Sequence, residues 1–119
     1  MKRLVLVVDD EPFIRMNAID MLADAGFEVV EAADAAEALT VLEVNPDVGV
    51  LFTDINMPGE MDGLELARRV HALRPTVHLI LTSGKVRLGE DDLPDAGAFI
   101  GKPYQENQII GLIHAAFAS

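Results

Sequence analysis

Residues 4–10 read Leu-Val-Leu-Val-Val-Asp-Asp, five apolar side chains followed at once by two acids. An unbroken aliphatic run of this length is typical of a strand that is buried on both faces, as strands are in a parallel sheet. Residues 48–54, Val-Gly-Val-Leu-Phe-Thr-Asp, show the same pattern and also end in an acid. We therefore predict two buried strands, each with a carboxylate at its carboxyl end.

Outward from the first strand, helical and strand patterns alternate along the chain. Pro12 begins a helical pattern that ends at Gly26. Asp34 and Glu37 have the spacing of a capping box, which predicts a second helix that ends before residues 45–46. Further strands are predicted at residues 28–31, 77–81 and 98–100, and further helices at residues 61–73 and 104–117. The side chains of the first helix that are expected to point inward are Ile14, Ala18, Met21, Leu22 and Ala25. This alternation predicts an α/β fold, a five-stranded parallel sheet with helices on both faces.

One segment interrupts the alternation. Between Thr82 and Phe99 the chain contains three glycines and a proline where a further helix would be due. Both residue types disfavour the interior of a helix. We therefore expect the fourth helix of the series to be short or irregular.

Length, charge and cysteine content exclude several classes of protein. The 119 residues are enough for a single domain, which we place at residues 1–119. A formal charge of −11 argues against direct nucleic-acid binding. The chain has no cysteine, which excludes disulfides and thiolate metal sites. No apolar run is long enough to cross a membrane, so we expect a cytoplasmic protein.

Polar side chains follow four of the predicted strands at the point where each strand ends. They are Asp9 and Asp10, Asp54, Thr82 with Ser83, and Lys102. Because the carboxyl ends of parallel strands lie at one edge of the sheet, we expect these residues to meet there. Taken singly, the acids could cap helices, Thr82 could end its strand with a local hydrogen bond, and Lys102 could be a surface residue at a turn.

Three carboxylates held together need compensating positive charge. Each close pair repels by ~4 kcal/mol at 4 Å with an effective dielectric constant near 20. Lys102 supplies one positive charge, and Mg²⁺ would supply two more. A set of oxygen ligands without His or Cys suits Mg²⁺ better than zinc. Such a site has the parts that stabilise a phosphoryl group during transfer.

Five short motifs occur in order along the chain. They are Val-Val-Asp9-Asp10-Glu11-Pro, Thr-Asp54-Ile-Asn56-Met-Pro58, Met-Asp-Gly-Leu-Glu-Leu at residues 61–66, Leu-Thr82-Ser and Lys102-Pro103-Tyr. In this order and at this spacing they resemble the receiver domain of two-component response regulators, over essentially the whole chain. The resemblance implies a flavodoxin-like, doubly wound sheet of strand order 2-1-3-4-5.

The resemblance also assigns roles at the acidic site. It implies that Asp54 accepts a phosphoryl group from a histidine kinase or a histidine phosphotransfer protein. Asp10, Asp54 and the backbone carbonyl of Asn56 would ligate Mg²⁺, while Asp9 would act mainly through water. A module of this kind is not an enzyme for an external substrate, since it catalyses only its own phosphotransfer and dephosphorylation.

Other residues take their expected roles from the same resemblance. Thr82 and Lys102 would each contact a phosphoryl oxygen. Phe99 occupies the family's switch aromatic position and would swing inward when Thr82 moves. The Lys102-Pro103 bond is expected to be cis, which only X-Pro bonds reach at low cost.

Two positions depart from the family pattern. One extra residue between Pro58 and residues 62–63 predicts a bulge at residues 59–60. Gly84, two residues after Thr82, has no side chain to orient or block a hydrolytic water, which leaves the phosphoryl lifetime open.

Partners and rival functions complete the interpretation. We expect a stand-alone monomer or weak homodimer that signals to an unidentified protein. We expect it to bind neither nucleic acid nor membrane. A receiver domain excised from a hybrid kinase would have the same sequence features. One rival is a Mg²⁺-dependent phosphohydrolase with an aspartyl nucleophile, but such enzymes usually carry Asp-x-Asp after the first strand. Another rival is a receiver-shaped interaction protein that is never phosphorylated.

Overall fold

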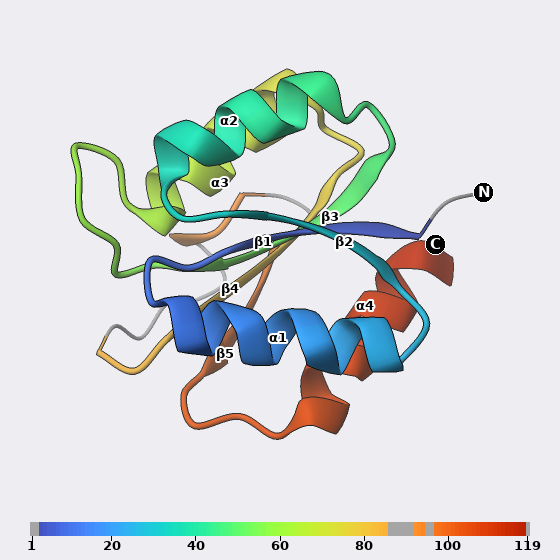
Figure 1. Cartoon of the computed structure of the whole chain (residues 1–119). Coiled ribbons are helices and arrows are strands. Elements are labelled where there is room, and N and C mark those ends of the chain that lie inside the picture. The colour runs from blue at the N-terminus through green and yellow to red at the C-terminus, as the bar shows by residue number, and fades with distance from the viewer. Residues whose placement is uncertain (1–2, 86–91, 95–96, 119) are drawn as a thin grey trace.

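Five parallel strands form one sheet in the order β2-β1-β3-β4-β5 (Figure 1). The computed structural model describes residues 3–85, 92–94 and 97–118. The strands are β1 (Leu4–Val8), β2 (Glu28–Ala32), β3 (Val48–Asp54), β4 (His78–Ser83) and β5 (Gly97–Gly101). Both the predicted parallel sheet and its strand order are confirmed.

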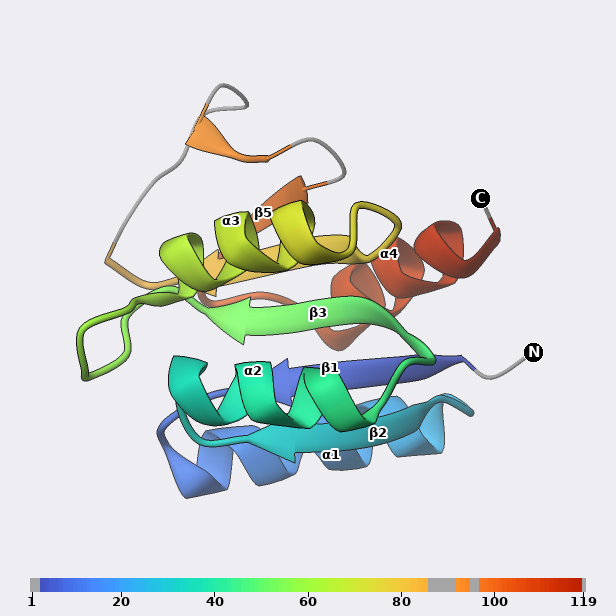
Figure 2. The ribbon, with the colours of Figure 1, turned by 90° about the horizontal axis from the view of Figure 1, so that it is seen from above.

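Four helices in the described part of the chain cover the two faces of the sheet. They are α1 (Pro12–Asp24), α2 (Ala35–Val44), α3 (Gly63–Leu73) and α4 (Glu106–Ala118). Figures 1 and 2 show α1 and α4 on one face and α2 and α3 on the other. None of these helices is long and apolar enough to cross a membrane.

Each face of the sheet packs against its helices through a separate apolar layer. Alternate strand residues point to opposite faces, so Leu6 and Leu51 lie in the layer under α2 and α3. Val5 and Val50 lie in the layer under α1 and α4. The central strands β1 and β3 are buried on both sides, and their sequences are apolar without alternation, whereas the edge strand β2 exposes Glu28 and Glu31.

Short-range hydrogen bonds define the helix ends. The side chain of Asp34 accepts from the N–H of Glu37 at 2.8 Å and begins α2, as the capping box predicts. Asp62 begins α3 in the same way by accepting from the N–H of Glu65 at 2.9 Å. Gly26, which follows the C-cap residue Ala25 of α1, has a φ of +92°, which glycine adopts without strain.

Some predicted details are wrong. Met61 lies before α3, because Asp62 caps that helix. Ile14, which the sequence predicts to point inward, is exposed on the first turn of α1. The last helix begins at Glu106 rather than at residue 104, and the Tyr104 ring before it packs edge-on against Phe52.

The expected irregular helix between Thr82 and Phe99 falls mainly on residues 86–91 and 95–96, which lie outside the described residues. Within the described part, Leu93 and Phe99 are partly buried against the apolar layer under α2 and α3.

Candidate functional site

The carboxyl ends of the strands form one edge of the sheet, on the left in Figure 1. An open pocket of about 560 Å³ lies there. Its lining includes Asp10 from the loop after β1, Asp54 from the end of β3, and Lys102 from the segment after β5. Residues from three distant parts of the sequence therefore meet because the sheet is parallel.

The acidic side chains predicted from the strand ends form a cluster. Carboxylate oxygens of Asp9, Asp10 and Asp54 all lie within 4.8 Å of one another. Asp9 is buried, whereas Asp10 and Asp54 are half-buried. The carboxylate of Asp9 accepts a hydrogen bond from the N–H of Glu11 at 2.9 Å.

Burial and neighbouring charge act together on Asp9. Burial raises the pKa of its carboxyl above the ordinary value of 3.8, and the nearby Asp54 and Asp10 raise it further. The Glu11 N–H and the Lys102 ammonium oppose this shift. The pKa of Tyr104 is also raised, first by burial and then by Asp9, Asp54 and Glu106. Burial is thus the main cause of both shifts, and the neighbouring carboxylates add to it.

A cation and a hydroxyl complete the edge. Nζ of Lys102 lies 3.7 Å from Oδ1 of Asp54. Thr82 pairs with Asp54 in the β3-β4 register, and its hydroxyl is buried without a hydrogen-bond partner among the described residues. The peptide bond between Lys102 and Pro103 is cis. Phe99 lies further back, beside Leu81 in the β4-β5 register.

Comparison with known proteins agrees with this arrangement. The family model of the response regulator receiver domain matches residues 5–114.

The chain belongs to the response regulator receiver domain family.

Relatives of different lengths share this receiver domain. The transcriptional regulatory protein PdtaR of Mycobacterium tuberculosis is 34% identical over 118 residues, which cover 96% of this chain and 56% of PdtaR. The chemotaxis protein CheY of Listeria monocytogenes is 38% identical over 117 residues, which cover 94% of this chain and 96% of CheY. The chain thus spans about half of one relative and nearly all of the other.

Solved structures show the same fold. A response regulator receiver protein from Pseudomonas putida is 32% identical, with a TM-score of 0.86 and coverage of 97% of this chain and 98% of that chain. The receiver domain is thus a phosphoacceptor signalling module of two-component systems.

Sequence reasoning missed the contact between Ser83 and Asn56 at the edge of this receiver domain. Oγ of Ser83 donates to Oδ1 of Asn56 at 2.5 Å and accepts from the N–H of Lys85 at 3.0 Å. The sequence predicts Ser83 at the strand end beside Thr82, but no rule of sequence spacing predicts its contact with Asn56. The contact ties the end of β4 to the loop after β3.

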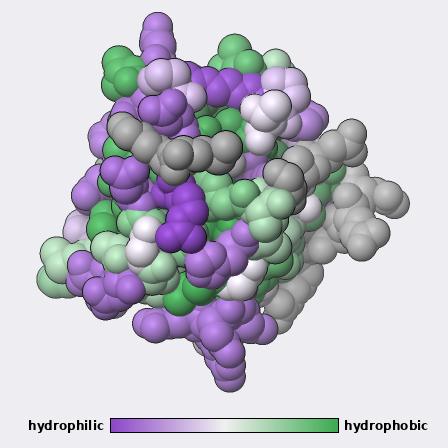
Figure 3. All heavy atoms as spheres, turned by 90° about the vertical axis from the view of Figure 1, so that its right-hand side faces the viewer, coloured by the Kyte–Doolittle hydropathy of each residue, from purple (hydrophilic) through white to green (hydrophobic). Residues whose placement is uncertain are grey.

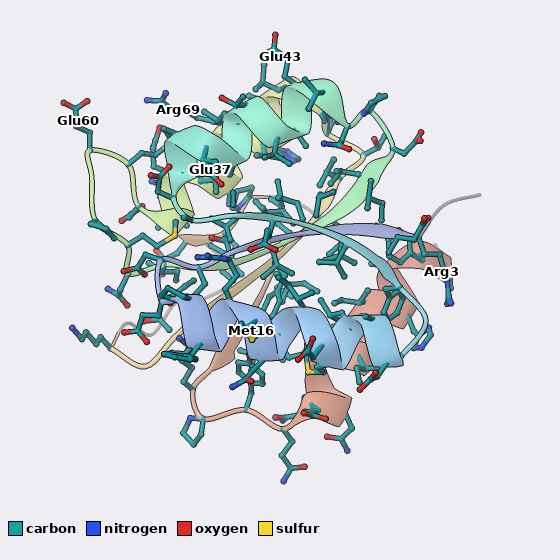
Figure 4. All side chains as sticks on the ribbon, in the orientation of Figure 1. Arg3, Met16, Glu37, Glu43, Glu60 and Arg69 are labelled. Carbon is teal, nitrogen blue, oxygen red and sulfur yellow. The ribbon has the colours of Figure 1, made fainter. Side chains whose placement is uncertain are left out.

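The loop after β3 projects at residues 59–60, where the sequence predicts a bulge (Figure 4). Gly59 has a φ of +104°, a backbone conformation that favours glycine. Figure 4 shows Glu60 at the outer end of this projecting loop. Gly63, at the start of α3, has no such φ but has no room for a side chain, because a Cβ there would lie 2.0 Å from the carbonyl oxygen of Asp54.

The opposite edge of the sheet differs in character. Figure 3 shows the face on the right of Figure 1, where hydrophilic and hydrophobic side chains are interspersed. Among the described residues, the cluster of three carboxylates, Asp9, Asp10 and Asp54, lies at the carboxyl edge of the sheet and not at this opposite edge.

Proposed function

We propose that Asp54 accepts a phosphoryl group from a phosphohistidine of a histidine kinase or a histidine phosphotransfer protein. An oxygen of Asp54 attacks the phosphorus, the phosphorus–nitrogen bond breaks, and the imidazole leaves as an acyl phosphate forms. The observation that carries the proposal is the joint position of three carboxylates and Lys102 at one open edge of the sheet.

The donor atoms fit Mg²⁺. The cluster offers carboxylate oxygens only, and the mutual repulsion of three carboxylates within 4.8 Å of one another supports the binding of a divalent cation there. Asp10, Asp54 and the backbone carbonyl of Asn56 would hold the ion, with Asp9 acting mainly through water. Bound Mg²⁺ supplies charge neutralisation for the carboxylates and the incoming phosphoryl oxygens.

Thr82 and Lys102 would stabilise the product. The Lys102 ammonium already lies beside Oδ1 of Asp54, where it can pair with a phosphoryl oxygen. The hydroxyl of Thr82, which has no hydrogen-bond partner within the described part of the chain, could donate to another oxygen once the acyl phosphate forms. Movement of Thr82 would leave room for Phe99 to turn inward, which would change the surface near β5 for a protein partner.

The same residues would govern loss of the phosphoryl group. The receiver domain would catalyse its own phosphotransfer and dephosphorylation. Gly84 is exposed and lines the pocket, so no side chain at that position restricts water.

Amide exchange with a phosphoryl analogue tests the proposal. With Mg²⁺, beryllofluoride is expected to slow or speed exchange of amides between Thr82 and Tyr104 in the wild type and to leave Asp54→Asn unchanged. The same change in both proteins, or none in the wild type, would refute the assignment of Asp54.

A further inference from the structure

Arg15, on the first turns of α1, joins three elements at the base of the acidic cluster. Its Nη1 donates to the backbone carbonyl of Asp9 at 2.7 Å. Its Nε donates to Oε1 of Glu31, near the end of β2, at 2.8 Å. The Arg15 side chain is 17% exposed and that of Glu31 is 54% exposed, so the guanidinium is mostly buried while its carboxylate partner faces solvent.

The contact from Arg15 completes the anchoring of Asp9. The N–H of Asp9 donates to the carbonyl of Ala32 at 3.3 Å, and its Oδ1 accepts from Glu11 at 2.9 Å. Arg15 binds the remaining backbone group, the carbonyl. That carbonyl belongs to the peptide that links Asp9 to Asp10, so its orientation sets the direction in which both acids leave the backbone.

Glu31 gives this arrangement a second property. Because the guanidinium is paired with the Glu31 carboxylate, its positive charge is largely balanced next to a site that attracts cations. A guanidinium fork also fixes geometry better than a point charge does. Arg15 can therefore orient the acidic loop without repelling a metal ion.

We propose that Arg15, held by Glu31, is a positioning residue for the divalent cation and thereby for phosphotransfer. The inference rests on the proposed function. In this inference Arg15 acts through the peptide between Asp9 and Asp10. It contributes the orientation of the two carboxylates and not its charge.

The two possible effects of Arg15 have opposite signs, which makes the test decisive. Removing a cation near the cluster would tighten Mg²⁺ binding if charge alone mattered. Loss of orientation weakens binding, by about tenfold if Arg15 behaves like other groups that orient metal ligands.

The experiment measures the dissociation constant of Mg²⁺ by calorimetry at fixed ionic strength. Arg15→Met and Glu31→Gln are both expected to weaken binding. The double variant is expected to be no weaker than Arg15→Met, because the two residues act as one unit. Arg15→Lys, which keeps the charge but not the fork, is expected to resemble Arg15→Met.

Arg69→Met is the matched control, because Arg69 forms a comparable pair with Glu65 at 3.2 Å on the exposed face of α3. Its Mg²⁺ affinity is expected to equal that of the wild type.

A measurement without metal keeps the inference falsifiable if a variant is less stable. In folded Arg15→Met, the amides of Asp9 and Glu11 are expected to exchange faster than in Arg69→Met. Unchanged or tighter Mg²⁺ binding by Arg15→Met would overturn the inference and leave the proposed function intact. A wild type that takes up no Mg²⁺ would overturn both.

Discussion

At Asp9, the requirements of folding and of function oppose each other. The carboxylate is buried within 4.8 Å of two others, and its pKa is raised, first by burial and then by Asp54 and Asp10. The folded chain therefore binds this proton more tightly than the unfolded chain. An acid in this position lowers stability at neutral pH unless a cation is present.

The substitution Asp9→Asn is therefore expected to raise the free energy of unfolding at pH 7 by about 1 kcal/mol without Mg²⁺, since it removes one charge from the cluster. The stabilising contribution of protonated Asp9 is complete below pH 3.8 and is lost as the pH rises through the raised pKa. The difference in the free energy of unfolding between Asp9→Asn and the wild type should therefore grow as the pH rises from 3.8 through the raised pKa of Asp9. Urea unfolding with a chelator at several pH values measures it, and a loss of stability at pH 7 would contradict the account.

Thr82 offers a second test at the same scale. Its hydroxyl is buried with no hydrogen-bond partner among the described residues, which costs free energy in the resting protein. Thr82→Val keeps the shape and is expected to stabilise by about 1 kcal/mol. The variant is also expected to respond less to beryllofluoride. Thermal unfolding and amide exchange measure the two effects, and destabilisation of the resting protein would argue against an unsatisfied hydroxyl.

The sequence predicted the acidic residues for a physical reason and missed Arg15 for another. Alternating strands and helices require a parallel sheet, which places the ends of distant strands together, so Asp10 and Asp54 could be paired without coordinates. Arg15 lies on a helix with no periodic or motif signal, and its bond to the Asp9 carbonyl depends on backbone geometry.

Among the elements, the start of α3 packs tightly against the end of β3. The N–H of Gly63 donates to the carbonyl of Ile55 at 2.9 Å, so the helix begins directly against the end of β3. A Cβ at Gly63 would lie 2.0 Å from the Asp54 carbonyl oxygen. The helix therefore helps to fix the backbone that carries Asp54.

Gly63→Ala is expected to lower the free energy of unfolding by about 3 kcal/mol, because neither backbone can move away easily. Gly111→Ala is the matched control, since a Cβ at Gly111 in α4 meets nothing within 4 Å. The control is expected to stabilise by about 0.5–1 kcal/mol through better helix propensity. Denaturant midpoints measure both, and equal effects would refute the packing argument.

Element identities were predictable where sequence and local chemistry agree. The Asp34 cap and the run at residues 4–8 locate α2 and β1 correctly. Met61 was assigned to α3 from apolar spacing, although Asp62 caps the helix after it. Apolar spacing also placed Ile14 inward, whereas this side chain lines the pocket at the acidic edge. Periodicity does not distinguish a core from a pocket wall.

For the whole molecule, charge is the dominant feature. Nine basic against 20 acidic residues give a formal charge of −11, and self-repulsion opposes the compact state. The order of the strands and the helix layers could be predicted from the apolar pattern and the family resemblance. The predicted irregular helix falls mainly on residues 86–91 and 95–96, which lie outside the described part of the chain.

General screening and specific metal binding should be separable. NaCl is expected to raise the Tm of wild type and Asp10→Asn alike, because it screens the whole surface. Mg²⁺ at matched ionic strength is expected to raise the Tm of the wild type further and that of Asp10→Asn no more than NaCl does. Differential scanning fluorimetry measures both. Equal Mg²⁺ and NaCl effects in the wild type would contradict a built metal site.

The central claim is phosphoryl transfer to Asp54, and intact-mass analysis after incubation with a small phosphodonor and Mg²⁺ tests it most directly. The account predicts one added phosphoryl group on the wild type, removed by hydroxylamine as an acyl phosphate is, and none on Asp54→Asn or without Mg²⁺. An equal mass increase in Asp54→Asn, or no increase in the folded, Mg²⁺-bound wild type, would contradict it.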